Sequence, residues 1–516
     1  MIGVRPLVLV LLDGWGICAE REGNALAQAR TPIYDRLAGT SPHAVLAASG
    51  EAVGLPAGRP GNAQAGYMTL GAGRPVTQSL VHINRAIQDD GAQSIGANPV
   101  FTQIVQRVRP LGGAVHLIGM ASPGGIAGHQ HHLAVLAALL SHEGVQVWIH
   151  AVTDGRDTSP QAGIDCLAEL LDDTAGAENA TLASLMGRAF AFDDPADPAA
   201  LAAAVKAIAD ADAPHTEYPA AHLDQCYLKG MADDRIAPVI TQKYRGIRQD
   251  DAVFLVNLRP DLGRGLMEAL LASPAARLLA GAYSLCELDG PARERVEPLF
   301  SEAPARPTLS ETLSRAGRTQ LLLTETIAET NLSLFLRGGT STIFNGETIG
   351  VAETPPLAKL ERRPELAAAD LVAEAIASIK KADRDFLVLN LPNVAVLGRT
   401  GNLRATIEAA EAVDKSLGKL AAQIEKRGGV MAITGAFGKG EIMVDAETGK
   451  PWRGPTRSNM PFTLAGLPAR ERRELRFGTL ADVAPTILGL LDVPVPEAMT
   501  GRSLILDPEQ ADRVTA

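Results

Sequence analysis

The sequence predicts an α/β protein with mainly parallel sheets and helices on both faces, on the basis of three observations. Short runs rich in leucine and β-branched residues alternate with longer alanine-rich segments of helical pattern. The apolar runs are continuous rather than alternating, as expected of strands that are buried on both faces. The chain has 516 residues, more than one core usually holds, so we expect two or three domains.

The expected strands are followed in most cases by polar or glycine-containing loops. They are Leu7–Leu12, Ala114–Ile118, Gln146–Ala151, Ala252–Asn257, Gln320–Thr324, Asp385–Asn390 and Gly429–Thr434. In open α/β sheets, ligands bind in the crevice outside the carboxyl ends of the strands. We therefore sought functional residues in the loops that follow these strands.

Two segments predict the domain boundaries. The prolines of Pro298–Pro307 indicate a linker, and a weaker boundary follows Gly73-Arg74-Pro75, before the helical pattern that begins at Ser79. We therefore expect a discontinuous domain made of residues 1–77 and 309–516, with a second domain, residues 78–308, inserted in it.

The net charge of −11 argues against a nucleic-acid partner, because binding to a phosphate backbone requires a basic surface. Two arginine clusters, Glu361-Arg362-Arg363 and Arg470-Glu471-Arg472-Arg473, are interleaved with acids and are expected to be solvated helix faces.

The cysteines and the N-terminus favour a cytoplasmic protein. Cys18, Cys166, Cys226 and Cys286 form no Cys-x-x-Cys pair, so neither a zinc site nor a disulfide framework is indicated. The apolar run Pro6–Leu12 is too short for a secretion signal or a membrane span. We expect reduced cysteines and no membrane partner.

The first predicted strand ends in an acid, in the order Leu7–Leu12, Asp13, Gly14. A carboxylate at the mouth of a strand is a common way to hold a metal ion at a catalytic crevice. An acid that merely caps a buried strand before a glycine explains this one motif equally well.

Further motifs follow in a fixed order along the chain. They are Asn24-Ala25, Ala29–Pro32, Ala48–Gly50, Val53–Pro56, Gly61-Asn62, Leu70–Arg74, Asp154–Thr158, Gly187-Arg188, Asn257–Asp261, Thr400–Leu403 and Glu411–Asp414. Together with Asp13, this series resembles the cofactor-independent (2,3-bisphosphoglycerate-independent) phosphoglycerate mutases of the alkaline phosphatase superfamily. The resemblance extends from about residue 5 to the last strand and helix.

The resemblance implies a monomer with an alkaline-phosphatase-like domain, built from both ends of the chain, and an inserted α/β phosphoglycerate-binding domain. It also implies a chemistry. In that family two manganese ions activate a serine, which takes the phosphate of 3-phosphoglycerate and returns it to the other hydroxyl. A cluster of arginines and a lysine hold the substrate.

The nucleophile of the family is missing from this sequence. The family segment Gly-Asn-Ser-Glu-x-Gly-His reads Gly61-Asn62-Ala63-Gln64-Ala65-Gly66-Tyr67, so Ala63 stands where the serine belongs. An alanine methyl group cannot accept a phosphoryl group. Replacement of the nucleophile by Tyr67 or Thr69 is the less favoured alternative.

The manganese ligands of the family are also largely missing. The family needs three histidines from the C-terminal half, and this chain has none after His222. The family's ligand positions are occupied by other residue types at Ala395, Arg399, Ala436, Phe437 and the neighbourhood of Pro455. Only Asp13 remains, and we therefore expect no manganese cofactor and a site filled by Arg399, Phe437 and Lys439.

The substrate side is retained in part. Arg156, Asp157, Arg188 and Arg259 stand where the family binds phosphoglycerate. Other family partners, which are histidine, arginine or lysine, are replaced at Ala127, Asp194, Leu262 and Ala328. The nearby histidines His129, His131 and His132 are interpreted as hydrogen-bonding residues rather than as a ligand triad.

These observations predict a catalytically inactive relative that retains a capacity to bind a phosphorylated three-carbon acid or a protein partner. The retained arginines have an equally favoured structural interpretation, as ion pairs with Asp154, Asp157, Asp193 and Asp261. The main alternative function is an active phosphoglycerate mutase of glycolysis and gluconeogenesis, which interconverts 3- and 2-phosphoglycerate. A metal-independent phosphatase is a third, less favoured function.

Overall fold

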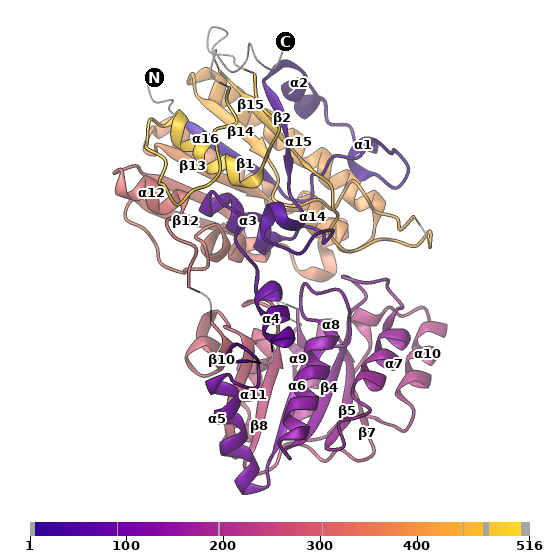
Figure 1. Ribbon diagram of the computed structural model, residues 1–516. Helices are drawn as coiled ribbons and strands as arrows, with labels where there is room; N and C mark the ends of the chain where they lie inside the picture. The colour runs from indigo at the N-terminus through magenta and orange to yellow at the C-terminus, as the bar shows by residue number, and fades with distance from the viewer. Residues whose placement is uncertain are drawn as a thin grey trace. The chain divides into compact units, whose positions relative to one another are not determined.

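The computed structural model describes residues 6–89, 91–193, 197–301, 303–446, 448–467 and 474–506. The chain forms two compact units (Figure 1). Unit 1 comprises Met1–Gln78 and Ala303–Ala516, and unit 2 comprises Ser79–Glu302. Two features of the sequence, the arginine cluster Arg470–Arg473 and Asp194, lie outside the described residues.

Unit 1 contains, within the described residues, an eight-stranded mixed sheet of order β12-β11-β13-β1-β14-β15-β2-β16. Its strands are β1 (Leu7–Leu12), β2 (His43–Ala47), β11 (Gln320–Glu325), β12 (Glu347–Ala352), β13 (Phe386–Leu391), β14 (Val430–Thr434), β15 (Met460–Ala465) and β16 (Gly478–Thr479). The four central pairings from β12 to β14 are parallel, and only β15 runs antiparallel to its two neighbours. The carboxyl ends of β11, β13, β1 and β14 therefore meet at one edge.

Helices cover both faces of this sheet (Figure 1). They are α1 (Ala25–Gln28), α2 (Pro32–Thr40), α3 (Ala63–Ala72), α12 (Leu309–Arg315), α13 (Ala368–Lys381), α14 (Asn393–Gly398), α15 (Leu403–Lys426) and α16 (Val483–Leu490). Side chains of β1 alternate between two cores: Leu7, Leu9 and Leu11 pack with α3 and α16, whereas Val8 and Val10 pack with α13 and α15. Because both faces are covered, every residue of β1 is buried.

Unit 2 contains a second eight-stranded mixed sheet within the described residues, of order β10-β9-β8-β3-β4-β5-β7-β6. Its strands are β3 (Ala114–Met120), β4 (Gln146–Thr153), β5 (Ala180–Gly187), β6 (His215–Thr216), β7 (Val239–Thr241), β8 (Asp251–Val256), β9 (Leu279–Cys286) and β10 (Glu297–Phe300). All pairings from β10 to β5 are parallel. The loops after β8, β3, β4 and β5 consequently lie along one edge of the sheet.

Helices also cover both faces of the second sheet. They are α4 (Ser79–Gln88), α5 (Pro99–Val108), α6 (Gln130–His142), α7 (Gly163–Asp173), α8 (Arg188–Ala191), α9 (Pro198–Ala209), α10 (Pro219–Leu228) and α11 (Arg264–Ala272). Residues Val115 and Leu117 of β3 face the core that includes α5 and α6, and Ile118 faces the core that includes α9 and α11.

The predicted α/β class with mainly parallel sheets is confirmed, and each of the seven predicted strands is present with small shifts at its ends. The predicted linker, however, begins too early. Pro298 lies within β10, at the edge of the second sheet, where it pairs with Ser284 of β9. An edge strand tolerates proline because the backbone N–H groups on its outer side have no neighbouring strand to bond.

Candidate functional site

Asp13 directly follows β1, at the centre of the first sheet. Its side chain is only 1% exposed. The backbone holds this position from two sides: the amide of Ala395 donates to the Asp13 carbonyl at 3.1 Å, and the amide of Gly14 donates to the Phe437 carbonyl at 3.0 Å. The loops after β13 and β14 are thereby bound to the end of β1.

The Asp13 carboxylate accepts hydrogen bonds from three side chains. The Tyr67 hydroxyl donates to both carboxylate oxygens, at 2.9 and 2.8 Å. The amide nitrogens of Asn390 and Asn331 donate to Oδ2 at 2.9 and 3.2 Å. Asn390 is oriented in turn by Thr324 on β11, whose hydroxyl donates to Asn390 Oδ1 at 2.8 Å.

Tyr67 reaches Asp13 because α3 packs very closely on the loop after β14. The helix begins after Asn62, whose side chain accepts from the amide of Ala65 at 3.0 Å. A Cβ atom at Gly66 would lie 2.2 Å from the carbonyl oxygen of Ala436, so only glycine permits this approach. The neighbouring Tyr67 is fully buried and points at the carboxylate.

Apolar side chains surround the Asp13 carboxylate. Ala63, Ala395, Ala436 and Phe437 belong to one buried apolar cluster together with Tyr67. Burial in these surroundings raises the pKa of Asp13 to about 6, against the opposing effect of its hydrogen bonds to Tyr67 and Asn390.

The cations near this centre are arranged differently from our expectation. Phe437 and Lys439 are buried as predicted, but Arg399 is exposed, so the prediction that Arg399 fills the buried site is wrong. Arg399 follows the short helix α14, and its charge lowers the pKa of Asp13.

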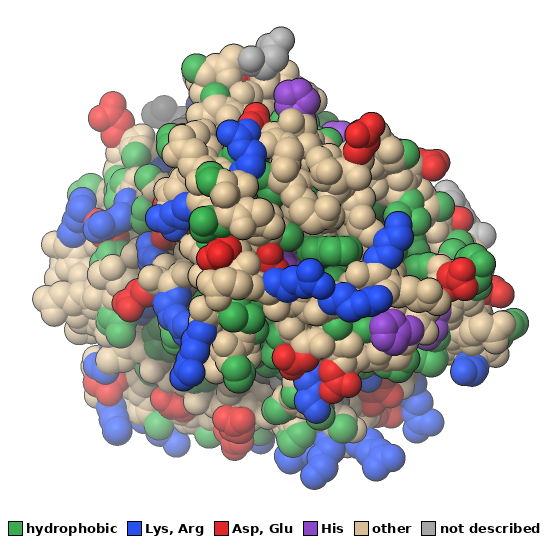
Figure 2. All heavy atoms as spheres, turned by 90° about the horizontal axis from the view of Figure 1, so that it is seen from below, with side chains coloured by type: hydrophobic (Ala, Val, Ile, Leu, Met, Phe, Trp, Pro, Cys, Tyr) green, Lys and Arg blue, Asp and Glu red, His purple; other side chains and the backbone are tan. Residues whose placement is uncertain are grey.

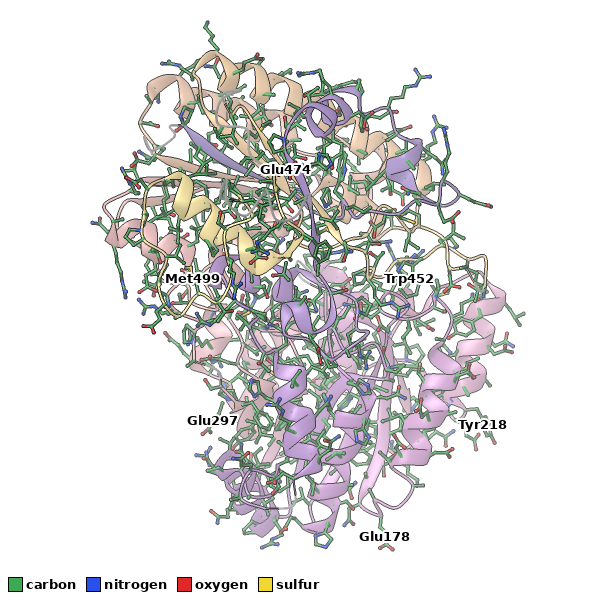
Figure 3. All side chains as sticks on the ribbon, turned by 45° about the horizontal axis from the view of Figure 1, so that its top comes forward. Glu178, Tyr218, Glu297, Trp452, Glu474 and Met499 are labelled. Atoms are coloured by element: carbon green, nitrogen blue, oxygen red, sulfur yellow. The ribbon has the colours of Figure 1, made fainter. Side chains whose placement is uncertain are left out.

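Lys439 is 1% exposed, and its Nζ donates to the carbonyl of Trp452 at 2.8 Å. Trp452, labelled in Figure 3, lies in the long loop that follows β14. The stem of Lys439 packs against Gly398, where a Cβ would lie 2.7 Å from the lysine Cγ. Burial lowers the pKa of Lys439 to about 7, although nearby Glu441 opposes this effect.

Tyr67 and Thr69, the two hydroxyls that were considered as replacement nucleophiles, are both fully buried in α3. The Tyr67 hydroxyl is engaged with Asp13, and burial beside this carboxylate raises the pKa of Tyr67 well above its ordinary value. A phenol held in this way is a poor nucleophile, because the deprotonated form is strongly disfavoured.

In unit 2, three of the four residues expected to bind substrate lie together at the carboxyl edge of the sheet. Arg156 and Asp157 follow β4, and Arg188 begins α8 directly after β5. Asp193, just beyond α8, bridges the two arginines: both of its oxygens accept from Arg156, at 2.9 and 2.6 Å, and Oδ1 lies 3.4 Å from Arg188 Nε. Asp234 lies 3.3 Å from Arg156 Nε.

Arg188 is the buried centre of this cluster. Its Nη1 lies 2.6 Å from Asp154 and 3.3 Å from Asp157. Burial lowers the pKa of Arg188, but Asp157, Asp154 and Asp193 raise it by more, so the guanidinium stays charged. Burial and the nearby Asp154 raise the pKa of Asp157, and Arg188 opposes both effects.

Arg259, the fourth expected residue, lies in the loop after β8 and forms a bidentate pair with Asp261, at 2.9 and 2.5 Å. Ala127 and Leu262 are buried in an apolar cluster of this unit. Ala328 is buried in unit 1. The predicted ion pairs of the arginines with Asp154, Asp157, Asp193 and Asp261 are present.

The histidines at the start of α6 face different surroundings. His132 is buried and lies with Nε2 2.8 Å from Asn84 Oδ1, whereas His131 is exposed. The Nδ1 atom of His129 accepts from the backbone amide of His131 at 3.2 Å. Burial and the nearby His129 and His131 lower the pKa of His132 to about 3.

Three further features concern metal binding, membranes and surface charge. Nowhere in the described residues do three or more His, Cys, Asp or Glu side chains gather in a way that could hold a metal ion. Of the helices that are described, none is long and apolar enough to cross a membrane. On the face seen in Figure 2, Lys and Arg side chains are interspersed with Asp and Glu side chains.

Sequence reasoning missed Asn331, Asn390 and Asp234. Asn390 was recognisable as a polar residue at the end of a predicted strand, and it pairs with Leu11 of the strand that precedes Asp13. Asn331 lies in a π-helical turn, η7 (Asn331–Phe335), that no simple pattern predicts. Asp234 lies in a short 3₁₀ helix, η3 (Asp233–Arg235), without a distinguishing motif.

Comparisons with known proteins agree with this architecture. A family model described as the metalloenzyme superfamily matches residues 5–495. The class of protein is therefore that superfamily, whose members include alkaline phosphatases.

Relatives of full length define the family within it. The chain is 36% identical to a 2,3-bisphosphoglycerate-independent phosphoglycerate mutase of Gluconobacter oxydans, over 97% of this chain and 98% of the relative. It is 35% identical to the protein of the same name from Rhodopseudomonas palustris, over 97% and 99%. The chain belongs to the 2,3-bisphosphoglycerate-independent phosphoglycerate mutase family, as the motifs predicted.

A solved structure is similar throughout. The chain matches Leishmania mexicana phosphoglycerate mutase, crystallised at low cobalt concentration, with a TM-score of 0.90, 26% identity and 98% of each chain covered.

Proposed function

We propose that this chain is a catalytically silent member of the phosphoglycerate mutase family. The observation that carries the proposal is the state of Asp13. Its carboxylate is buried among apolar side chains and is already bound by Tyr67, Asn390 and Asn331. Phosphoryl transfer depends on positioning and on charge neutralisation at the transferring group, and few groups of either kind remain at this centre.

The residues around Asp13 do not fit the manganese ions of the family. A metal ligand offers a lone pair, and manganese prefers oxygen ligands such as carboxylates, carbonyls and water. Here the side chains that surround the carboxylate direct O–H and N–H groups toward it. No histidine follows His222 in the sequence. We therefore derive no catalytic step through a metal ion.

The nucleophile is missing in the same region. Ala63 occupies the family's serine position at the N-terminus of α3 and is buried. Tyr67 and Thr69 are fully buried in the same helix, so neither presents a hydroxyl to a substrate. A methyl group at this position leaves no group to carry the phosphoryl intermediate.

Binding of a phosphorylated acid in unit 2 requires an exchange of partners. Asp193 occupies the space between Arg156 and Arg188, and Asp261 occupies the fork of Arg259. A phosphate group recognised by these guanidinium groups has to displace the carboxylates, which offsets part of the binding free energy. We propose weak binding of a phosphorylated three-carbon acid, or binding of a protein partner, as the remaining function of this unit.

One observation favours a second function, an active phosphoglycerate mutase. Two relatives that carry this name are 36% and 35% identical to the chain over almost their whole length. Such an enzyme would interconvert 3- and 2-phosphoglycerate, and this chain would need both a new nucleophile and a new source of positive charge.

An enolase-coupled assay with added Mn²⁺ separates the two functions. The chain is assayed beside the Gluconobacter oxydans relative, which serves as the positive control. We expect no turnover above a heat-inactivated sample. Turnover that scales with the concentration of this protein would refute catalytic silence.

Calorimetric titration with 3-phosphoglycerate tests the binding function. We expect weak binding that is lost in Arg259→Ala and retained in Arg109→Ala, a control at an exposed ion pair with Glu143. Equal heats for both variants would exclude Arg259 from the binding site. No heat at millimolar ligand would leave the protein partner as the proposed function.

A further inference from the structure

The Asp13 centre joins four parts of unit 1 that are far apart in the sequence. Asp13 follows β1, Tyr67 comes from α3, Asn331 from η7 and Asn390 from β13. Residue separations from Asp13 are 54, 318 and 377 respectively. A bound metal ion connects distant segments of a chain through its ligands. The hydrogen bonds to Asp13 connect distant segments in a comparable way.

The hydrogen bonds form a closed set. Tyr67 OH donates to both oxygens of Asp13 and accepts from Asn390 Nδ2 at 2.7 Å. Asn390 Nδ2 also donates to Asp13, and the Asn390 carbonyl oxygen accepts from Thr324. Each polar group of the triangle of Asp13, Tyr67 and Asn390 has a partner within it or beside it, as a buried polar network requires.

The geometry points to a structural role for this centre. We propose that the carboxylate of Asp13, held by Tyr67, Asn331 and Asn390, is a metal-independent cross-link that stabilises unit 1 in place of a bound ion. This proposal rests on the proposed function, because it says what takes the place of the metal ions around Asp13. It is tested by measuring stability rather than turnover.

Tyr67 is the central residue of this cross-link, because its hydroxyl contacts both carboxylate oxygens. Tyr67→Phe removes the hydroxyl and leaves Asp13 Oδ1 buried without that donor. We expect its Tm to fall by about 2–12 °C. Tyr218→Phe is the matched control: this tyrosine is 66% exposed, and we expect its Tm to stay within about 1 °C of the unmodified protein.

Asp13→Asn distinguishes a hydrogen-bonded cross-link from a metal site. The asparagine oxygen can take the place of Oδ2 and accept from Asn390, Asn331 and Tyr67, while its amide donates to the phenol oxygen. The variant is therefore expected to fold with a Tm close to that of the unmodified protein. A metal ligand replaced in this way loses its charge and with it the ion.

The decisive experiment is differential scanning calorimetry of the full chain and the three variants, each with EDTA and with millimolar Mn²⁺. We expect that neither addition changes the Tm values. We also expect a lower Tm for Tyr67→Phe than for Tyr218→Phe and Asp13→Asn, which should stay close to the unmodified protein. A rise in Tm with Mn²⁺ that Asp13→Asn abolishes would overturn the proposal. A Tyr67→Phe variant as stable as Tyr218→Phe would overturn it as well.

If Tyr67→Phe does not fold, the response of the unmodified protein and of Asp13→Asn to Mn²⁺ still decides the question. The result is also separable from the proposed function. Turnover in the enolase-coupled assay without a response of Tm to metal would refute catalytic silence and leave the cross-link standing. A response to metal without turnover would do the opposite.

Discussion

Nη1 of Arg188 lies 2.6 Å from Oδ1 of Asp154, and this contact is buried between the ends of β5 and β4. Asp154 is held in addition by the hydroxyl of Ser122 after β3, at 2.6 Å. This ion pair and the hydrogen bond from Ser122 together connect three neighbouring strand ends of unit 2.

Removal of Arg188 should destabilise the protein strongly. Arg188→Gln leaves Asp154, Asp157 and Asp193 close together without their cation, and we expect a loss of about 3–5 kcal/mol in the free energy of unfolding. Urea unfolding measures this loss. Arg109→Ala, at an exposed pair, is the control with an expected loss of about 0–1 kcal/mol. Equal losses in both variants would show that the buried cluster contributes no more than a surface pair.

Restoring the nucleophile alone should not restore catalysis. Ala63→Ser places a hydroxyl at the N-terminus of α3, but Asp13 remains bound to Tyr67, and the proposed function includes no metal ion to neutralise the transferred phosphate. We expect no turnover in the enolase-coupled assay with or without Mn²⁺. Measurable turnover in this variant would show that Ala63 is the only obstacle to catalysis and that our account of the charged groups is wrong.

His132 should make the protein less stable in acid. Its pKa is about 3 in the folded protein and about 6.5 in the unfolded chain, so between these values the unfolded chain binds one more proton. The free energy of unfolding therefore falls as the pH decreases from about 6.5, by up to ~1.4 kcal/mol per pH unit. Stability above this window is unaffected.

His132→Gln should lack this part of the acid slope, because glutamine does not titrate. Urea unfolding at pH 6, 5 and 4 measures the free energy of unfolding of the variant and of the unmodified protein. The contributions of all other titrating groups cancel in the difference between the two. His131→Gln is the control, because His131 is exposed. Parallel pH profiles for the unmodified protein and His132→Gln would contradict the prediction.

Lys439 should produce a slope of the same sign at alkaline pH. Its pKa is about 7 in the folded protein and about 10.5 in the unfolded chain, so the unfolded chain binds more protons between these values. Stability should rise with pH in this window, by up to ~1.4 kcal/mol per pH unit. Lys439→Met should lack the rise, and at pH 7 it should be as stable as the unmodified protein or more so.

Equilibrium unfolding at pH 7, 8 and 9 tests this prediction, with Lys415→Met as the control at an exposed position of α15. If the difference in free energy of unfolding between Lys439→Met and the unmodified protein does not change with pH, the prediction of a buried, titrating amine is contradicted.

Whether a strand could be predicted from the sequence depended on how completely it is buried. β1 was recognisable because six consecutive apolar residues are buried on both faces. β2 was missed because it mixes buried and partly exposed positions near the edge of its sheet, and it pairs antiparallel with β15.

The family was determined by the sequence alone, because the ordered motifs identify it. The residue types are fixed in the same way: Ala63 lacks a hydroxyl in any conformation, and no folding can supply a histidine beyond His222. The sequence also predicted the aspartate partners of Arg156, Arg188 and Arg259, as one of two alternatives.

Only the tertiary structure decided what surrounds Asp13. It brings Tyr67, Asn331 and Asn390 to Asp13, buries Lys439 and leaves Arg399 exposed. The physical reason is that the partners of a side chain depend on how distant parts of the chain pack, as Asp13 and Asn390 show. The functional groups of a residue, by contrast, are fixed by its type and can be read from the sequence.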